Sequence, residues 1–539
     1  MPRIDLALAL VLAAVTALTR LPFRARLLPT WDAVQFALAL HEYDVVKHQP
    51  HPPGYILFVA LGRLVDAVAG DPTASLTGLA LGAAAATVFL VYRLAWRLYG
   101  RATAVVAAAA LAASPLFWFY GVVGLSYTTE AALATALAAS IWRLRDGGPR
   151  AVLASALALG LAGGVRQSVL VLLFPLWLGM AWAHCPPGRR GRAVLAGLGV
   201  LGLATAAWLV PMVGLTGGAG RYVGAALELF DSTIRATTVL GEWRVNAVAL
   251  TEGLVLGLGL LLPAGAVLAV VGLRRLPRWD ARAWFFAGWV VPPLVVYAFF
   301  HFGQYGYLLT ILPALYILLG RGLAAAAARL AAPVPRAALT AGLLGVVVLG
   351  HAAFFTRAGS IEVPGFLAAE PGAAGGRTSL RARYRFRLWP HTAGGLREQE
   401  AVIQAYVDGV RREFDPSDTV LVTELGNARS YPWFRHVRYY LPEYAVCHLR
   451  LDPYSPGYLS AQHDSSMVAL GGPEVLLPSS TRRLVWIVDH WNPRAPRPPG
   501  LRERPLPHGR WLYVLDLERR AVEHGGYRLT PVAAVARVR

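Results

Sequence analysis

Long apolar stretches recur along the 539 residues of this chain and restrict its possible folds more than any other feature. A helix needs about 20 mostly apolar residues to cross the hydrocarbon core of a bilayer. Eleven segments approach this requirement, so we predict a mainly α-helical, polytopic membrane protein. The predicted spans are residues 5–22, 74–95, 102–120, 128–143, 151–165, 168–184, 193–214, 250–272, 283–300, 306–320 and 338–356.

Composition agrees with this prediction. Hydrophobic residues make up 56% of the chain and charged residues 15%, whereas soluble domains carry roughly 25% charged residues. The first apolar run is followed by Arg20, Leu21 and Pro22 and not by a small-residue cleavage site, so we expect it to remain as a span. The two cysteines, Cys185 and Cys447, cannot make a disulfide framework or a four-ligand zinc site.

The basic residues are distributed as in a membrane protein whose N-terminus is cytoplasmic. The chain has 51 Lys and Arg residues against 31 Asp and Glu, a net charge of +20. Arginines gather in every second short loop, which the positive-inside rule assigns to the cytoplasm. These clusters lie at residues 93–101, 143–150, 189–192, 274–282 and 321–336. We therefore expect membrane lipids and no nucleic acid as partners, and an odd number of spans places the C-terminus outside.

Residues 357–539 are less apolar and are predicted to form a soluble extracytoplasmic α/β domain after a transmembrane domain of residues 1–356. Three short apolar runs predict strands, and one segment has helical spacing. The strands are expected at residues 418–424, 483–489 and 511–517, and the helix at residues 396–414. The basic and aromatic tract at residues 381–387 is interpreted as a solvated or headgroup-facing strand.

The loop between the first two spans contains more structure than a simple connection needs. Residues 31–43 and 55–65 predict amphipathic helices along the membrane surface, and the prolines of residues 50–53 impose a turn between them. Asp32 lies at the start of the first of these helices. Its carboxylate could serve as a helix N-cap or as a general base that takes a proton from an acceptor hydroxyl.

This loop resembles a known family. Asp32-Ala-Val-Gln-Phe followed by His51-Pro-Pro-Gly-Tyr, with Leu57 and Gly62 beyond, is similar to the first outer loop of GT-C membrane glycosyltransferases. The nearest branch is DUF2723, which is related to protein O-mannosyltransferases of glycosyltransferase family 39 and to aminoarabinose transferases. The branch typically shows Asp-x-Gly-Glu-Phe and His-Pro-Pro-Gly-Tyr-Pro-Leu, and the resemblance covers about residues 25–170.

The resemblance implies a GT-C fold and makes Asp32 the catalytic base. Gln35 stands where the branch has a second acidic residue, and Ile56 stands where it has a proline. The first departure weakens any expectation of a two-carboxylate or metal site in this loop. His48 and His51, with Asp44 or Glu42, leave a divalent metal open as a cofactor, beside the alternative that His51 orients the loop or contacts phosphate.

Glu130 and Arg166 are the next candidates, at the predicted outer ends of the fourth and fifth spans. Ionisable groups at the edge of the hydrocarbon are costly and tend to be functional. Glu130 resembles a second acidic residue of GT-C enzymes in position and could bind the acceptor or a metal, or simply lie in a first helical turn. Arg166 follows two glycines and could bind phosphate bidentately or extend to lipid headgroups.

Further polar residues are candidates for substrate binding. The segment His301-Phe-Gly-Gln-Tyr-Gly-Tyr resembles Tyr-rich segments that line the donor site in GT-C proteins, although it also fits an aromatic belt. The outer loop at residues 215–249 offers arginines that could meet a phosphate. The complete set of expected substrate-binding residues is His51, Tyr55, Glu130, Arg166, Arg244, His301, Gln304 and Tyr307.

These residues together predict an inverting glycosyltransferase. Its donor would be a polyprenyl-phosphate sugar, and its acceptor a hydroxyl of a protein, lipid or glycan on the outer face of the membrane. One alternative is a non-enzymatic transporter of lipids or sugar-lipids, although transporters place their polar residues near the middle of the membrane. A second alternative is a membrane-anchored binding protein that works through residues 357–539.

Overall fold

The structure is a computed structural model of the whole chain, and its helices and strands fall into two compact units. It describes residues 1–235, 238–241, 243–263, 280–301, 303–330, 335–357, 359, 361–362, 388–389, 391–425, 431, 433–451, 457–462, 467–492, 495–518 and 520–531. The first unit contains Met1–Arg26, Ala39–Val363 and Arg387–Leu396, and the second contains Leu27–Leu38, Pro364–Phe386 and Arg397–Arg539.

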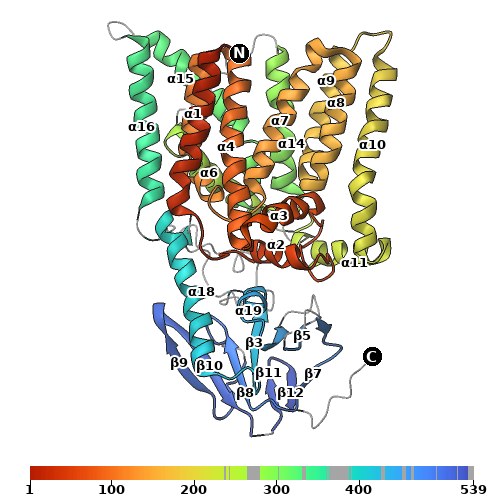
Figure 1. Cartoon of the computed structure of the whole chain (residues 1–539), viewed down its shortest axis with the longest axis vertical. Coiled ribbons are helices and arrows are strands. Elements are labelled where there is room, and N and C mark those ends of the chain that lie inside the picture. Colours follow the sequence, from red (N-terminus) through yellow and green to blue (C-terminus); the bar gives the residue numbers. More distant parts are fainter. Residues whose placement is uncertain are drawn as a thin grey trace. The chain divides into compact units, whose positions relative to one another are not determined.

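The first unit consists of long apolar helices that run side by side (Figure 1). Seven of them are long and apolar enough to cross a membrane, counted over the described residues, so the chain is a multi-pass membrane protein. These seven are α1 (Arg3–Arg20, continued by η1, Leu21–Phe23), α4 (Pro72–Tyr99), α8 (Leu144–Val165), α9 (Gln167–His184), α10 (Arg190–Leu215), α14 (Ala281–Phe299) and α16 (Arg336–Thr356).

Shorter helices complete this unit. They are α3 (Ile56–Ala69), α5 (Arg101–Ala113), α6 (Pro115–Tyr120), α7 (Tyr127–Trp142), α11 (Ala219–Leu229), η2 (Phe230–Ile234), α12 (Arg244–Leu258), η4 (Gly259–Leu261), η5 (Tyr305–Thr310) and α15 (Leu312–Leu330). The helix α2 (Trp31–His41) is shared between the two units. The short strands β1 (Ile361–Glu362) and β2 (Leu388–Trp389) pair with each other.

Every predicted span coincides with helix in the described residues, but several differ from the expected single α-helix, since 3₁₀ turns end the span 5–22 and follow α12 within the span 250–272. The span 102–120 is broken after Ala113, because Pro115 starts a new helix whose N-cap is Ser114. The span 306–320 begins as the 3₁₀ helix η5 before α15. The second part of the span 250–272 lies outside the described residues, and the count of eleven spans stays a prediction.

Small residues let the helices of this unit approach closely. A Cβ atom on Gly160 of α8 would lie 2.7 Å from the Cβ of Ala204 in α10, and one on Gly320 of α15 would lie 2.9 Å from the backbone nitrogen of Ala107 in α5. Close helix approach at small residues is a main source of packing between helices in a membrane.

The two helices predicted in the first loop are present as α2 and α3. The expectation that the first is amphipathic is wrong, because residues 33–37 are buried without a polar face turned to solvent. The side chain of Arg63 of α3 caps the C-terminus of α2. Its Nε donates to the carbonyl of Leu40 and its Nη2 to the carbonyl of Ala39, each at 2.9 Å. Lone carbonyls at a helix C-terminus are satisfied in this way.

The second unit is an α/β domain, as predicted. Its seven-stranded sheet has the order β6-β5-β4-β3-β8-β10-β9, with β3 parallel to both β4 and β8. A second sheet of three strands has the order β11-β12-β7. The strands are β3 (Thr419–Leu425), β4 (Ala445–Arg450), β5 (Tyr458–Ser460), β6 (Val468–Ala469), β7 (Glu474–Leu477), β8 (Arg483–Ile487), β9 (Arg502–Leu506), β10 (Arg510–Asp516), β11 (Val522–His524) and β12 (Tyr527–Pro531).

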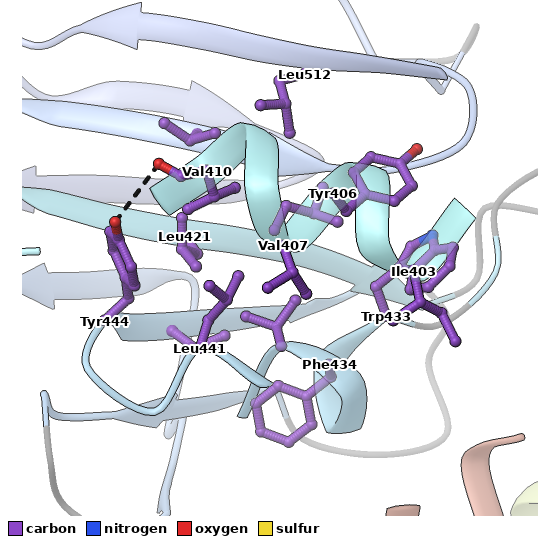
Figure 2. Packing of buried hydrophobic residues seen from close by; sticks show 14 of the residues in the cluster. Ile403, Tyr406, Val407, Val410, Leu421, Trp433, Phe434, Leu441, Tyr444 and Leu512 are labelled. Carbon is purple, nitrogen blue, oxygen red and sulfur yellow. Dashed lines mark hydrogen bonds between the residues drawn. The ribbon is translucent and has the colours of Figure 1, made fainter. Parts of the chain in front are cut away.

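The helix α18 (Ala393–Glu413) covers this sheet and confirms the helix expected at residues 396–414. Figure 2 shows its apolar side, with Ile403, Val407 and Val410, packed against Leu421 of β3 and Leu512 of β10. The short helix α19 (Phe434–Tyr440) adds Phe434 to the same core. The three strands expected from the sequence are confirmed as β3, β8 and β10, and the tract at residues 381–387 lies outside the described residues.

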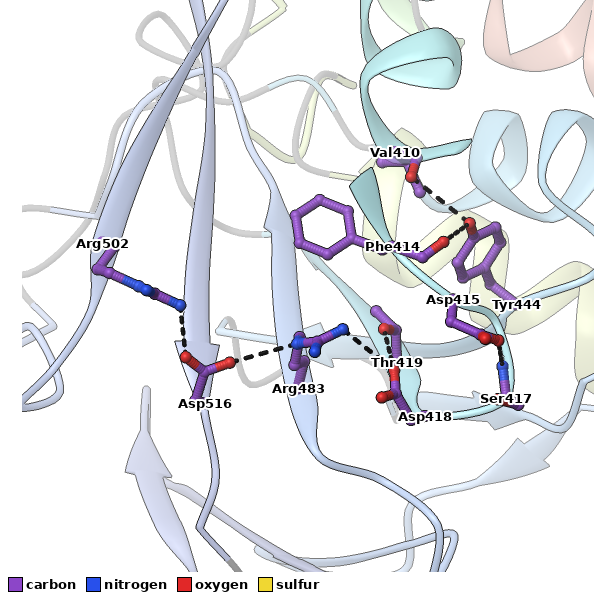
Figure 3. Close-up of polar contacts among 10 residues, drawn as sticks. All are labelled: Val410, Phe414, Asp415, Ser417, Asp418, Thr419, Tyr444, Arg483, Arg502 and Asp516. Carbon is purple, nitrogen blue, oxygen red and sulfur yellow. Dashed lines mark hydrogen bonds and ion pairs between the residues drawn. The ribbon is translucent and has the colours of Figure 1, made fainter. Parts of the chain in front are cut away.

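Charged side chains join neighbouring strands at one end of this sheet (Figure 3). Asp516 of β10 pairs with Arg502 of β9 and, at 3.4 Å, with Arg483 of β8. Arg483 also reaches Asp418 before β3, at 3.4 Å. Arg502 and Asp516 are exposed, and Arg483 and Asp418 are half-buried, so we assign the stability of the sheet mainly to its apolar core.

Replacement of a core side chain should therefore lower the stability of this sheet. Leu421→Ala removes a side chain that is fully buried, which we expect to lower the free energy of unfolding by about 2–5 kcal/mol. Native-state hydrogen exchange of the β3 and β8 amides in the full-length protein measures this change. Leu476→Ala on β7, where the leucine is 47% exposed, is the matched control and should change the exchange little.

Candidate active site

Asp32 lies in the first turn of α2, and Thr30 is the N-cap of this helix. The Oγ1 of Thr30 accepts a hydrogen bond from the amide of Ala33 at 3.3 Å. The alternative in which Asp32 caps the helix is therefore wrong. Asp32 is half-buried and lies in the first turn of the helix, at the positive end of the helix dipole.

Tyr431 of the second unit lies close enough to Asp32 for the charge of the carboxylate to affect the pKa of its phenol. Burial is the main cause that raises the pKa of the Tyr431 phenol, and the negative charge of Asp32 is the next. The phenol therefore stays protonated at neutral pH. Asp32 thus stands beside a neutral hydroxyl group and belongs to the same unit as that group.

The loop between α2 and α3 is fastened by hydrogen bonds to its proline turn. The hydroxyl of Tyr43 donates to the carbonyl of Gly54 at 2.7 Å. Gln167 of α9 and Tyr222 of α11 both donate to the carbonyl of Pro53 at 3.1 Å. Tyr55 follows with φ +45°, a left-handed conformation that costs a residue with a Cβ about 1–2 kcal/mol. The loop therefore holds Tyr55 in one strained position at the start of α3.

Glu130 and Arg166 form a buried ion pair. The Nε of Arg166 lies 2.6 Å from Oε2 of Glu130, and the two side chains are 6% and 0% exposed. The other carboxylate oxygen, Oε1, accepts hydrogen bonds at 2.8 Å from Ser168 of α9 and Thr310 of η5. One terminal nitrogen of Arg166 donates to Ser126 at 2.6 Å. The pair therefore joins α7, the junction of α8 with α9, and η5.

Three tyrosine rings surround the guanidinium group of Arg166. Its Cζ lies 4.5 Å from the ring centre of Tyr127, 5.4 Å from that of Tyr307 and 5.6 Å from that of Tyr55. Each ring presents a face of negative partial charge to the cation. Tyrosines from three distant parts of the chain thus stabilise one charge in an otherwise apolar region.

Polar residues predicted in the segment 301–307 extend this cluster. The hydroxyl of Tyr127 donates to Oε1 of Gln304 at 2.5 Å. The ring of His301 packs edge-on against Tyr307 at 5.2 Å. Tyr297 of α14 stacks on the ring of Tyr307, with 4.6 Å between ring centres.

Gly306 is required for this arrangement. A Cβ atom at this position would lie 2.6 Å from the ring of Tyr127, closer than real side chains approach. Gly164 of α8 likewise allows α3 and α10 to pack closely, because a Cβ there would lie 2.7 Å from Leu57 and from Trp208. Both glycines allow the close packing that brings the tyrosines to Arg166.

The structure brings most of the expected substrate-binding residues together in the first unit. Contacts join Tyr55, Glu130, Arg166, His301, Gln304 and Tyr307, either directly or through Tyr127. His51 joins them through Tyr55, whose hydroxyl lies 3.2 Å from its Nε2. Arg244 is the exception: it begins α12, is exposed, and forms no hydrogen bond or ion pair with another described residue.

Five residues of this cluster were not expected from the sequence, namely Ser126, Tyr127, Ser168, Tyr297 and Thr310. Ser126 and Ser168 lie within four residues of Glu130 and Arg166 in the chain, so helical spacing could have indicated them. Tyr127 lies between Ser126 and Glu130 at the start of α7. Thr310 lies 180 residues from Glu130, and no local pattern connects them.

A metal site is not formed by the histidines of the first loop. No group of three or more His, Cys, Asp or Glu side chains that could hold a metal ion occurs within the described part of the chain. Asp44 instead accepts hydrogen bonds from the amides of Val46 and Lys47, at 2.9 and 3.2 Å. Lys47 pairs with Glu42.

The comparison with known families bears on this part of the chain. Residues 32–186 match the family model of the protein O-mannosyl-transferase TMEM260 N-terminal domain. The matched stretch begins at Asp32 and contains His51, Glu130 and Arg166. Residues 32–186 are protein O-mannosyltransferase-like. The resemblance expected from the sequence is thereby confirmed for this stretch.

Two solved structures are similar to the chain. They are ArnT from Cupriavidus metallidurans bound to undecaprenyl phosphate and the same protein in the apo state, with sequence identities of 15% and 14% and a TM-score of 0.49 for each. The alignments cover 81% and 83% of this chain and 84% of each ArnT chain. Comparison with curated proteins gives no match.

Loss of one partner of the buried ion pair should destabilise the first unit. Glu130→Gln leaves the charge of Arg166 buried without its counter-ion, which we expect to cost about 3–5 kcal/mol. A second change, Arg166→Met, should recover part of this loss in the double variant. Thermal unfolding in detergent compares the stability of the purified wild type, of Glu130→Gln and of the double variant.

The pair of Arg97 with Asp146 offers a matched control, since its side chains are 40% and 74% exposed. Asp146→Asn should change the stability by less than about 1 kcal/mol. Equal losses for Glu130→Gln and Asp146→Asn would contradict the importance of the buried pair.

Proposed function

We propose that the chain is an inverting glycosyltransferase of the GT-C type. It transfers a sugar from a polyprenyl-phosphate donor to an acceptor hydroxyl of a protein, lipid or glycan at the outer face of the membrane. The observation that carries this proposal is the family match over residues 32–186, which begins at the half-buried carboxylate of Asp32. The same stretch contributes Glu130 and Arg166 to a buried polar cluster in an apolar unit.

In this proposal Asp32 is the general base. The acceptor oxygen attacks the anomeric carbon of the sugar from the side opposite to the phosphate. Its proton passes to Asp32, and the bond between the anomeric carbon and the phosphate oxygen breaks. Polyprenyl phosphate leaves with the electron pair, and the anomeric centre is inverted. One carboxylate suffices because the phosphate is already a good leaving group.

Arg166 is proposed to hold the phosphate of the donor. Its Nε pairs with Glu130 and donates a hydrogen bond to Ser168, and one terminal nitrogen donates to Ser126. Its other terminal nitrogen, Nη2, would donate to a phosphate oxygen. Fixed donors aimed at the leaving group stabilise the charge that develops on it.

Glu130 acts through Arg166 in this proposal, since both of its oxygens already have partners. The ion pair has no net charge, so further donors have to contribute to the binding of an anionic donor. The hydroxyl of Tyr55 lies 3.2 Å from Nε2 of His51, and the ring of Tyr55 lies 5.6 Å from Cζ of Arg166. We assign them to the phosphate or to the sugar hydroxyls.

The base assignment is tested by Asp32→Asn. The amide cannot take up the acceptor proton, so we expect kcat to fall by about 10²- to 10⁴-fold with little change in the KM for the donor. Sugar transfer from a polyprenyl-phosphate donor is measured with the purified full-length protein in lipid nanodiscs.

Asp71→Asn serves as the matched control. Asp71 is the N-cap of α4 and accepts hydrogen bonds from Thr73 and Ala74. Asparagine caps helices equally well, so this variant should keep full activity. Near-normal turnover of a folded Asp32→Asn variant would exclude Asp32 as the base.

The proposed orientation places the N-terminus in the cytoplasm and the C-terminal domain outside. A reporter enzyme that is active only outside the cytoplasm, fused after residue 539, should therefore give a signal in cells. The same reporter fused within residues 185–189, next to a basic loop, should be silent. The opposite pattern would reverse the topology and the side of the membrane on which the reaction takes place.

A further inference from the structure

The segment that leads to Asp32 depends on the second unit for its hydrogen bonds. Residues 24–30 contain neither helix nor strand, and buried backbone groups in such a segment need partners from elsewhere. Residues 27–38 group with the C-terminal domain, although Leu27 and its partner Glu400 lie 373 residues apart in the sequence.

Three side chains of the C-terminal domain bind the backbone just before α2. The amide of Leu27 donates to Oε1 of Glu400 in α18 at 3.2 Å. The amide of Leu28 donates to the hydroxyl of Tyr440 at 2.7 Å, and the carbonyl of Leu28 accepts from Nε2 of His436 at 3.0 Å. Glu400 and His436 are buried. These backbone groups are thus satisfied by three side chains from two helices, α18 and α19.

The protonation of His436 agrees with this contact. Burial lowers the pKa of its imidazole to about 4, so the ring is neutral at pH 7 and carries one N–H. The carbonyl of Leu28 can only accept, and this N–H must therefore be on Nε2. The hydrogen bond to Leu28 is consequently maintained over the physiological pH range.

A second group of contacts holds the first turn of α2. Tyr431 lies near the backbone of Trp31, and the guanidinium of Arg435 lies 5.9 Å from the ring of Trp31. The amide of Tyr431 in turn donates to Oδ2 of Asp489 at 2.8 Å. Asp489 is paired with Arg510 of β10 at 3.1 Å. Polar contacts therefore lead from the sheet through Asp489 to Tyr431, which lies near Trp31 and Asp32.

Apolar packing supports the same segment. The side chains of Leu27 and Trp31 pack against the core cluster that Figure 2 shows, which includes Tyr406 and Trp433. Hydrogen bonds set the direction of the backbone, and the apolar contacts resist its displacement. Two kinds of contact, hydrogen bonds to the backbone and apolar packing of the side chains, therefore hold the first turn of α2 within the second unit.

We propose that the C-terminal domain positions the catalytic carboxylate of Asp32, with Glu400, Tyr431, His436 and Tyr440 as positioning residues. This inference rests on the proposed function, because it takes Asp32 to be the base. A general base has to lie within hydrogen-bond reach of its proton, and a displacement of about 1 Å can cost about 10²-fold in rate. The domain is in this way a part of the catalytic machinery and not an appended module.

The inference is tested with variants that remove single hydrogen bonds from the segment. Tyr440→Phe removes the acceptor of the Leu28 amide, and His436→Leu removes the donor to the Leu28 carbonyl. His436→Gln keeps an N–H donor at similar reach and should rescue. Tyr444→Phe is the matched control, because the hydroxyl of Tyr444 donates to the carbonyl of Phe414 at 2.7 Å in the same domain (Figure 3).

Two measurements on the full-length protein in nanodiscs are combined. Hydrogen exchange of peptides from residues 27–38 should accelerate in Tyr440→Phe and His436→Leu, while peptides of β3 and β8 keep the protection of the wild type. In the same variants kcat should fall by about 10- to 100-fold with an unchanged KM for the polyprenyl-phosphate donor. His436→Gln and Tyr444→Phe should retain the exchange at residues 27–38 and the kcat of the wild type.

Several outcomes would overturn the inference. Unchanged exchange at residues 27–38 in both variants would show that the domain does not hold the segment. Faster exchange with unchanged kcat would show that the position of Asp32 does not depend on these contacts. A fall in kcat for Tyr444→Phe equal to that for Tyr440→Phe would indicate a general loss of stability.

Failure of the proposed function is distinguishable from these results. In that case the wild type transfers no sugar from a polyprenyl-phosphate donor, which overturns the catalytic role assigned to the domain. The exchange data would still decide, on their own, whether the domain holds residues 27–38.

Discussion

The ion pair of Glu130 and Arg166 is the interaction on which the arrangement of the first unit depends. A charge in an apolar environment is tolerated when it is paired and its remaining hydrogen-bonding atoms have partners. The carboxylate meets this requirement with Arg166, Ser168 and Thr310, and the guanidinium meets it with Ser126 and three tyrosine rings. Each of these partners fixes another segment, so the pair determines how α7, α9, η5 and the start of α3 meet.

A comparable constraint acts on the segment that carries Asp32. The loop residues before α2 have no secondary structure of their own, and side chains of α18 and α19 satisfy their backbone groups. Both candidate centres are therefore built from residues far apart in the sequence. In the first unit the partners are charged and aromatic groups, whereas in the second they are neutral groups and one carboxylate acting on the backbone.

Much of the fold could be predicted because it follows from local patterns. Apolar stretches near 20 residues give membrane helices, and short apolar runs in the C-terminal domain gave the strands β3, β8 and β10. The breaks were harder to predict, since the interruption at Ser114 and Pro115 lies within a continuous apolar run. The burial of residues 33–37 in α2 was also missed, because Gln35 within an apolar stretch indicates a polar face, whereas it is buried.

The sequence by itself determined which residues carry the chemistry: an acidic residue in a structured first loop, an acidic residue and an arginine at the ends of apolar helices, and a Tyr-rich segment. Residue type and position in an apolar chain are enough to make such groups conspicuous. Only the tertiary structure decided how these groups are partnered. It joined Glu130 to Arg166, left Arg244 out, and grouped Asp32 with the C-terminal domain, whose Glu400 lies 373 residues after Leu27. Pairing of this kind depends on distances between remote segments, and those distances arise from the packing of the whole chain.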